Sequence, residues 1–220
     1  EFFADQKLQQ VIGMALTNNR DLRIAALSVE RARAMYGIQR SELFPTVDAT
    51  GSGYIQRLPA DLSSTGSRQT LERYDANLGV TSWEIDFFGR IRSFKDRALQ
   101  EYFATEQARR SAQILLVSSV ANAYMALAAD RENFTLSETT LKAQQAAYDL
   151  IKRRYQLGLL PELELFRAQT PLEVARRDVA IYTQLVAKDL NALTLLAGGP
   201  VPAELLPVDL NSITLLDDLS

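Results

Sequence analysis

The residues best placed to do chemistry lie in the segment RRYQLGLLPELELFRAQ, residues 153–169. Two arginines precede Gly158, and Glu162 and Glu164 follow Pro161. Cations near the last carbonyl groups of one helix, and carboxylates near the first amide groups of the next, complement the helix dipoles. The chemistry that this spacing favours is ion pairing at a turn between two helices.

Catalytic chemistry finds little support in the rest of the chain. Its 220 residues include no Cys and no His, which excludes disulfides, thiolate zinc sites, cysteine nucleophiles and His-dependent triads. The sequence also has no Gly-rich phosphate loop, metal-ligand cluster or nucleophile elbow. It therefore predicts a protein that is not an enzyme and that needs neither a cofactor nor a metal.

The balance of charges argues against nucleic acid as a partner. There are 24 basic and 27 acidic residues, a net charge of −3, and no clustered basic face of the kind that phosphate binding needs. The first residues, EFFADQ, lack the features of a signal peptide. The uncharged run 111–129 is rich in small residues and is interrupted by polar ones, so we interpret it as a tightly packed helix rather than a membrane span.

Two helices are predicted in the first part of the chain. One covers 6–17 and ends at Asn18 and Asn19, since Asn tolerates left-handed geometry at a helix terminus. The other covers 21–43 and cannot continue through Pro45.

Two longer helices are predicted in the second part. Residues 90–157 contain neither Gly nor Pro, so we expect one helix of roughly 100 Å at 1.5 Å per residue. Gly158 ends it, and a helix over 162–197 follows, with a glycine cap at Gly198. Pro171 is expected to kink that last helix or to break one of its hydrogen bonds.

A seven-residue repeat runs through the second half of the longest predicted helix. Its members are Val120, Leu127, Phe134, Leu141, Tyr148 and Tyr155. Such spacing keeps one seam facing a partner helix and implies a left-handed supercoil. Because the seam mixes aliphatic with aromatic residues, we expect several neighbouring helices rather than a simple dimer.

Between residues 46 and 83 the period changes from helical to two. Apolar or small residues occupy the odd positions of 46–56 and the even positions of 74–80, and polar residues occupy most of the others. These segments predict a β-hairpin with a long polar loop at 58–69. Two interpretations remain open, an ordinary antiparallel hairpin packed on a helix and a pair of outer-membrane barrel strands.

Three motifs resemble the TolC-type outer-membrane efflux channel family. The run WEIDFFGR, 83–90, is similar to that family's strand-to-helix junction. The run RRYQLG, 153–158, followed by an acid and by RAQ, 167–169, is similar to its helical turn. The run ALTNNRDLR, 15–23, leads to LFPT, 43–46, at the first strand. The order and separation of the three motifs resemble the N-terminal repeat of an efflux-pump channel, without the second repeat.

The resemblance implies a fold class and a division of the chain. We expect a mostly α-helical subunit with a β-hairpin, in which a long antiparallel coiled coil forms part of an α-barrel and two strands join a trimeric outer-membrane β-barrel. The expected parts are an N-terminal helical segment, the helical barrel, the membrane hairpin and a linker: 1–20, then 21–45 with 84–197, then 46–83, then 198–220. Any lipidated cysteine of the pump branch would lie upstream of Glu1.

The implied function is that of a passive exit duct in the bacterial outer membrane, extending into the periplasm. As a homotrimer it would export drugs or other small toxic molecules, with a periplasmic adaptor (a membrane fusion protein), an inner-membrane pump and outer-membrane lipid as partners. A protein-secretion channel of the same family and a non-membrane coiled-coil scaffold are the alternatives. The hairpin and its WEIDFFGR junction argue against the scaffold, because a coiled-coil scaffold requires neither.

The resemblance also implies four groups of site residues. The gate residues are Glu164 and, as second choice, Glu162; the adaptor-docking tip is Arg153, Tyr155, Gly158, Leu159 and Leu160. The barrel–helix junction is Trp83, Asp86, Gly89 and Arg90; the pore-facing strand residues are Asp48, Thr50, Ser52, Asp75, Asn77 and Thr81.

Three of these residues also have a purely structural interpretation: Glu164 as a helix N-terminal charge, Tyr155 as a seam residue and Trp83 as a packing residue. The sequence departs from the family pattern at three positions. The family commonly has Pro at the position of Arg20, a small polar residue at that of Pro161 and Asp at that of Glu164.

Overall fold

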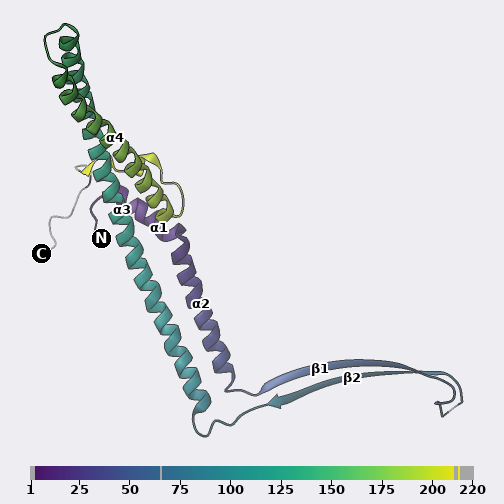
Figure 1. Ribbon diagram of the computed structural model, residues 1–220. Coiled ribbons are helices and arrows are strands. Elements are labelled where there is room, and N and C mark those ends of the chain that lie inside the picture. The colour runs from purple at the N-terminus through teal and green to yellow at the C-terminus, as the bar shows by residue number, and fades with distance from the viewer. Residues whose placement is uncertain (1–2, 65, 211–212, 214–220) are drawn as a thin grey trace. The chain divides into compact units, whose positions relative to one another are not determined.

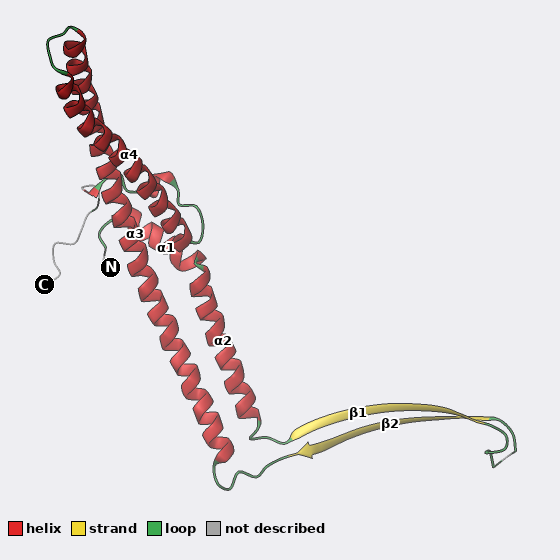
Figure 2. Ribbon diagram, viewed as in Figure 1, coloured by secondary structure: helices red, strands yellow, loops and turns green. Residues whose placement is uncertain are grey.

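The computed structural model of the chain describes residues 3–64, 66–210 and 213, with only the backbone of Thr81 and Ser82. The elements, in chain order, are α1 (Gln6–Asn18), α2 (Arg20–Ser41), β1 (Thr46–Leu58), β2 (Gln69–Ser82), α3 (Arg90–Gln156), α4 (Glu162–Ala197) and a short 3₁₀ helix, η1 (Ala203–Leu205). Helices predominate, with one two-stranded antiparallel sheet (Figure 2). This confirms the expected fold class.

The chain divides into two compact units. The first comprises Glu1–Leu27 and Gln107–Ser220, and the second comprises Ser28–Glu106. The first therefore contains α1, α4 and the later part of α3, and the second contains the hairpin and the strand-to-helix junction. The helix α3 is 67 residues long, within one residue at each end of the predicted helix.

The core of the first unit forms where α1 lies against α3 and α4 (Figure 1). Leu8, Val11 and Ala15 are buried on one stripe of α1, as expected of a helix with one apolar face. They pack with a cluster from α3 and with Leu193 of α4. The α3 members of this core are Leu116, Val120, Ala121, Tyr124 and Leu127.

The predicted seam of α3 is buried most deeply near this core. Val120 and Leu127 are fully buried, the next three members are half-buried, and Tyr155 at the end is exposed. On α4, the buried residues Leu172 and Leu193 are 21 positions apart, which is three seven-residue repeats. By length and composition α3 contains a stretch apolar enough to cross a membrane, and a third of that stretch is buried within this chain.

Both long helices of the first unit end in the same hydrogen-bonded turn. At the end of α3, Gly158 donates its N–H to Tyr155 O and Leu159 donates to Arg154 O. At the end of α4, Gly198 and Gly199 donate to Leu195 O and Thr194 O. The two leading glycines have φ of +72° and +76°, a conformation that glycine adopts without the steric cost of a Cβ atom.

The α1–α2 junction differs from the expectation in its backbone. Asn19 has φ −62° and ψ 129°, which is extended and not left-handed. Its buried side chain accepts a hydrogen bond from Leu22 N at 2.9 Å and donates to Leu196 O at 3.0 Å. Asn19 therefore caps the start of α2 and also satisfies a carbonyl at the end of α4, and this pair of bonds selects the extended backbone.

The remaining helix boundaries agree closely with the sequence pattern. Helix α2 ends at Ser41, two residues before the predicted end, and α4 starts after Pro161 and continues through Pro171 as one helix. Pro171 is exposed. Within the part of the chain that the structure describes, all residues with positive φ are glycines.

Gly198 is the position where the first unit tolerates a side chain least. A Cβ atom there would lie 2.4 Å from Asn18 O, whereas one on Gly158 would meet nothing within 4 Å. We therefore predict that Gly198→Ala lowers the free energy of unfolding by about 2–4 kcal/mol, from the backbone clash added to the conformational strain.

Gly158→Ala carries only the conformational strain and is the matched control, with an expected loss of about 1 kcal/mol. Thermal unfolding of the full-length protein, followed by circular dichroism, measures both. Equal losses for the two variants would contradict the close approach of Asn18 to Gly198.

Candidate functional site

The β-hairpin separates its polar residues from its apolar ones. In the observed register Asp48 lies opposite Gly79, Thr50 opposite Asn77 and Ser52 opposite Asp75. Five of the six predicted pore-facing residues therefore share one face, because directly opposed residues point to the same side of a sheet. The side chain of the sixth, Thr81, lies outside the described residues.

The opposite face of the hairpin is apolar along most of its length. Four cross-strand pairs make it up: Val47 with Val80, Ala49 with Leu78, Gly51 with Ala76, and Gly53 with Tyr74. On the polar face, Arg73 and Asp75 form an ion pair at 3.0 Å. A two-stranded sheet with one polar and one apolar face suits a wall between water and a less polar phase.

The strand-to-helix junction is held by charges that flank Gly89. Arg90 forms a two-point ion pair with Glu84, because its Nε and Nη2 donate to Oε1 and Oε2 of the carboxylate. The Arg90 Cζ atom also lies 5.6 Å from the centre of the Phe94 ring. The hydrogen bond from Arg90 lowers the pKa of Glu84, and Glu84 in turn raises the pKa of Arg90. Gly89 has φ +78°, which lets the chain turn from the strand into α3.

Asp86 caps the first turn of α3. Its carboxylate accepts a hydrogen bond from Arg92 N at 3.0 Å and another from the Arg92 guanidinium at 3.3 Å. These bonds, the backbone one above all, lower the pKa of Asp86. An acidic acceptor at a helix start stabilises the amide groups that have no partner within the helix. Trp83 donates Nε1–H to Leu43 O at 3.4 Å and stays exposed.

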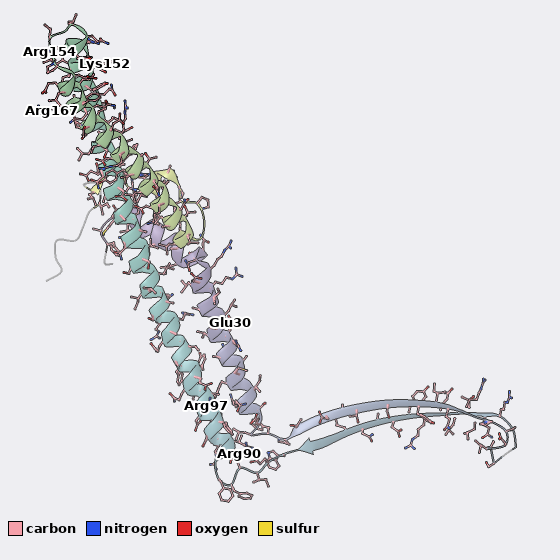
Figure 3. The ribbon with its side chains drawn as sticks, viewed as in Figure 1. Glu30, Arg90, Arg97, Lys152, Arg154 and Arg167 are labelled. Carbon is pink, nitrogen blue, oxygen red and sulfur yellow. The ribbon has the colours of Figure 1, made fainter. Side chains whose placement is uncertain are left out.

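The turn between α3 and α4 exposes apolar and basic side chains together. Leu157, Leu159 and Leu163 are exposed, and Leu160 is half-buried. Lys152, Arg154 and Arg167 extend at this end of the helical hairpin (Figure 3). Arg153 and Tyr155 are also exposed, so the predicted tip residues lie together around Gly158.

Glu164 has a partner in its own helix. Its Oε1 accepts a hydrogen bond from Arg167 Nη1 at 2.8 Å, three residues further along α4. The Glu164 side chain remains 39% exposed, and Glu162 is exposed beside it. Surface ion pairs of this type contribute about 0–1 kcal/mol, so the Glu164 carboxylate can exchange partners at little cost.

Three contacts, two at these sites and one in the core, were not foreseen from the sequence. The Glu164–Arg167 pair has the three-residue spacing that brings side chains together on a helix, so that signal was available. The contact of Asp86 with Arg92 depends on the turn at Gly89 and leaves no periodic pattern. Asn19 contacts Leu196 across the fold, and its local sequence marks only the α1–α2 junction.

Comparison with protein families gives one match to most of the chain. The family model described as "Outer membrane efflux protein" matches residues 11–199. A relative from Pseudomonas putida, the "Toluene efflux pump outer membrane protein TtgC", is 48% identical over 213 residues, which are 96% of this chain and 44% of that protein. The chain thus spans about half the length of the curated relatives it matches.

Solved structures have the same fold. A membrane protein from Pseudomonas aeruginosa superposes with a TM-score of 0.82 at 35% identity, over 100% of this chain and 51% of that one. The open state of the Neisseria gonorrhoeae MtrE outer membrane channel superposes with a TM-score of 0.77 at 31% identity, over 99% and 48%. The hairpin, the junction and the helical turn belong to this fold, whose members are non-enzymatic proteins of the bacterial outer membrane. The chain is a member of the outer membrane efflux protein family and matches the N-terminal half of its relatives.

Proposed function

We propose that the complete subunit forms the outer-membrane exit duct of a tripartite efflux pump. Three subunits would close one barrel in the membrane and one helical barrel in the periplasm, and small apolar toxic molecules would leave through the shared channel. The observation that carries this proposal is the hairpin's register, which places Asp48, Thr50, Ser52, Asp75 and Asn77 on one face and apolar side chains on the other.

The length of the strands supports a membrane location for the hairpin. Strands β1 and β2 have 13 and 14 residues, and a tilted membrane strand needs about 9–11. The polar face would line a water-filled path, while the apolar face would contact lipid. Such a duct needs no chemistry of its own, because the inner-membrane pump supplies the energy.

The turn at Gly158 supports a docking role for the tip. Exposed leucines in a cluster are a feature of protein-interaction surfaces, and the basic residues around them provide charge for recognition. We propose that Arg153, Gly158, Leu159 and Leu160 meet a periplasmic adaptor, and that Tyr155 closes the helical seam beside them.

The position of Glu164 just after the tip supports a role in closing the channel. In a threefold assembly its carboxylate would approach a basic residue from the half of the family's subunit that this chain does not match, with Glu162 as a second acid. Arg167 offers the Glu164 carboxylate an alternative partner at similar cost. Adaptor docking would therefore need little energy to break the three Glu164 contacts that close the channel.

Loss of the complete subunit tests the proposed export function. Removing its gene from the host should raise the cellular accumulation of toluene several-fold, because the relative TtgC belongs by its name to a toluene efflux pump. Re-expression should reverse this. Normal toluene levels together with the loss of a secreted protein would favour the protein-secretion channel instead.

Substitution of the gate carboxylate tests the closing mechanism. Glu164→Gln in the full-length trimer should raise conductance across a planar bilayer, because three links of up to about 1 kcal/mol each are lost. Together they change the ratio of open to closed channels by up to a factor on the order of 100. Glu173→Gln is the matched control, since Glu173 pairs with Arg176 on the same helix at the same spacing.

The control variant should leave conductance unchanged. Arg167→Gln should not raise it either, since Glu164 would remain available for its partner across the channel. Equal conductance of the Glu164→Gln and Glu173→Gln variants would contradict the gate.

A charge placed in the tip tests docking. Leu159→Asp should reduce crosslinking of the full-length protein to its adaptor several-fold, because a buried carboxylate at an apolar contact is costly. Leu62→Asp, in the hairpin loop, changes a leucine of similar exposure, 71% against 68%, and should leave crosslinking unaffected. The docking surface is wrong if both variants crosslink as the unmodified protein does.

A further inference from the structure

Two aspartates, Asp130 on α3 and Asp189 on α4, lie at the same level of the helical hairpin. The two helices lie side by side (Figure 1), and Arg176 on α4 donates to Gln145 on α3 at 3.0 Å. Asp130 is fifteen positions before Gln145, and Asp189 is thirteen positions after Arg176. At 1.5 Å per residue these intervals are about 22 Å and about 20 Å. Because the helices run in opposite directions, the intervals end at the same level.

Both aspartates are on the core-facing sides of their helices. Leu127 is three positions before Asp130, and Leu193 is four positions after Asp189. Residues at these spacings share one face of a helix. Leu127 and Leu193 are fully buried in one core cluster, and the two aspartates are half-buried. Their side chains, which we call the carboxylate pair, therefore lie at the contact between α3 and α4, one turn from the core.

The geometry of the carboxylate pair favours a shared proton. Oδ2 of Asp189 is buried and has no hydrogen-bond partner among the described residues. A hydrogen bond between two carboxyl groups requires a proton on one of them, since an ionised carboxylate only accepts. Burial above all, then the hydrogen bond with Asp130 and the charge of Asp130, raises the pKa of Asp189. This is the behaviour of two carboxylates that share a site.

The charged groups on the neighbouring elements leave this balance in place. On α4, Lys188 lowers the pKa of its neighbour in the pair, but with the smallest effect. On α3, Arg131 donates to a backbone carbonyl of the segment after α4, and Glu132 accepts from a backbone amide there. On α1, Asp5 accepts from amide groups of its own helix, and Glu204 of η1 is exposed. The state of the pair is therefore set by its own proton.

We propose that the carboxylate pair is a proton-dependent contact between α3 and α4. With one carboxyl protonated, its O–H donates to the other carboxylate and the helices stay packed. With both ionised, the two charges repel and the helices separate more readily at this level. The same helices lead to the turn at Gly158, so ionisation would loosen the hairpin that carries this turn. The proposal goes beyond the efflux function and does not require it.

The direction of the pH dependence follows from the raised pKa of Asp189. The packed state holds the proton more tightly than the opened state, in which an aspartate titrates near its usual pKa of about 4. The contact is therefore fully present below that pH and is lost as the pH rises through the raised pKa. Alkaline conditions should favour opening of the hairpin, and acidic conditions should oppose it.

Hydrogen exchange of the full-length protein tests the proposal, because amide exchange in a helix reports its opening. Asp189→Asn is read on α3 around Asp130, and Asp130→Asn is read on α4 around Asp189, so that neither substitution alters the amides that are measured. An asparagine amide donates as a protonated carboxyl does, and it keeps the contact at any pH. At about pH 8 the unmodified protein should exchange several-fold faster than either variant, and at about pH 5 the rates should agree within about twofold.

Asp178→Asn is the matched control. Asp178 is also on α4, but its carboxylate pairs with Arg177 at 2.8 Å and is more exposed, so this variant should exchange as the unmodified protein does at both pH values. Unstructured peptides of the same sequence correct for the pH dependence of chemical exchange, and the unmodified protein alone should then still open more as the pH rises.

Equal exchange of the unmodified protein and both asparagine variants at the higher pH would overturn the proposal. A difference of the same size at both pH values would overturn it as well, because it would reflect a packing change without a proton. Either result would leave the proposed duct standing.

Discussion

The proposed duct depends on one constraint, that the two faces of the hairpin suit different solvents. Adjacent side chains of a strand point to opposite sides, so a shift of one residue in the pairing would mix polar and apolar residues on both faces. The observed register avoids this by opposing polar to polar residues, such as Thr50 to Asn77, and apolar to apolar residues, such as Ala49 to Leu78. A membrane wall also requires closure, since unpaired strand edges do not occur in hydrocarbon. Two strands cannot close a barrel alone. This agrees with the comparison in which the chain matches only 44% of the length of TtgC.

The helical part follows a different periodicity for a related reason. Residues repeated every seven positions share one face of α3, on which a neighbouring helix can pack. The seam is most buried where α1 joins it and least buried at the tip. The tip thus leaves apolar side chains exposed. Glycines end both helices because the turn that satisfies their last carbonyl groups needs positive φ. At Gly198 the neighbouring backbone of Asn18 excludes any side chain as well.

Much of the fold was predictable because it follows from periodic patterns and from Gly and Pro. The turn at Gly158, the helix over 90–157 and the paired alternation of the strands all leave such patterns in the sequence. The β-bulge near the end of β2 leaves no such pattern. Val47 pairs with Val80 and Thr46 with Ser82, so Thr81 is one extra residue, which is visible only once the register is known. The bond from Asn19 to Leu196 joins residues far apart in the chain, and local propensity carries no information about it. At the site, the grouping of the tip residues and of five polar strand residues was predictable. The partners of Asp86 and Glu164 depend on local turn and rotamer geometry.

The central claim is that the polar face of the hairpin lines a water-filled path through the membrane. Ion selectivity measures this most directly, because a charge on the wall of a channel acts on the ions that pass it. Asn77→Asp and Asn77→Lys place opposite charges at one position of that face, in full-length channels opened by Glu164→Gln. With a salt gradient across a planar bilayer, the two variants should shift the reversal potential in opposite directions, toward cation and anion selectivity respectively. If neither variant shifts the reversal potential in channels that still conduct, the polar face does not line the path and the account is wrong.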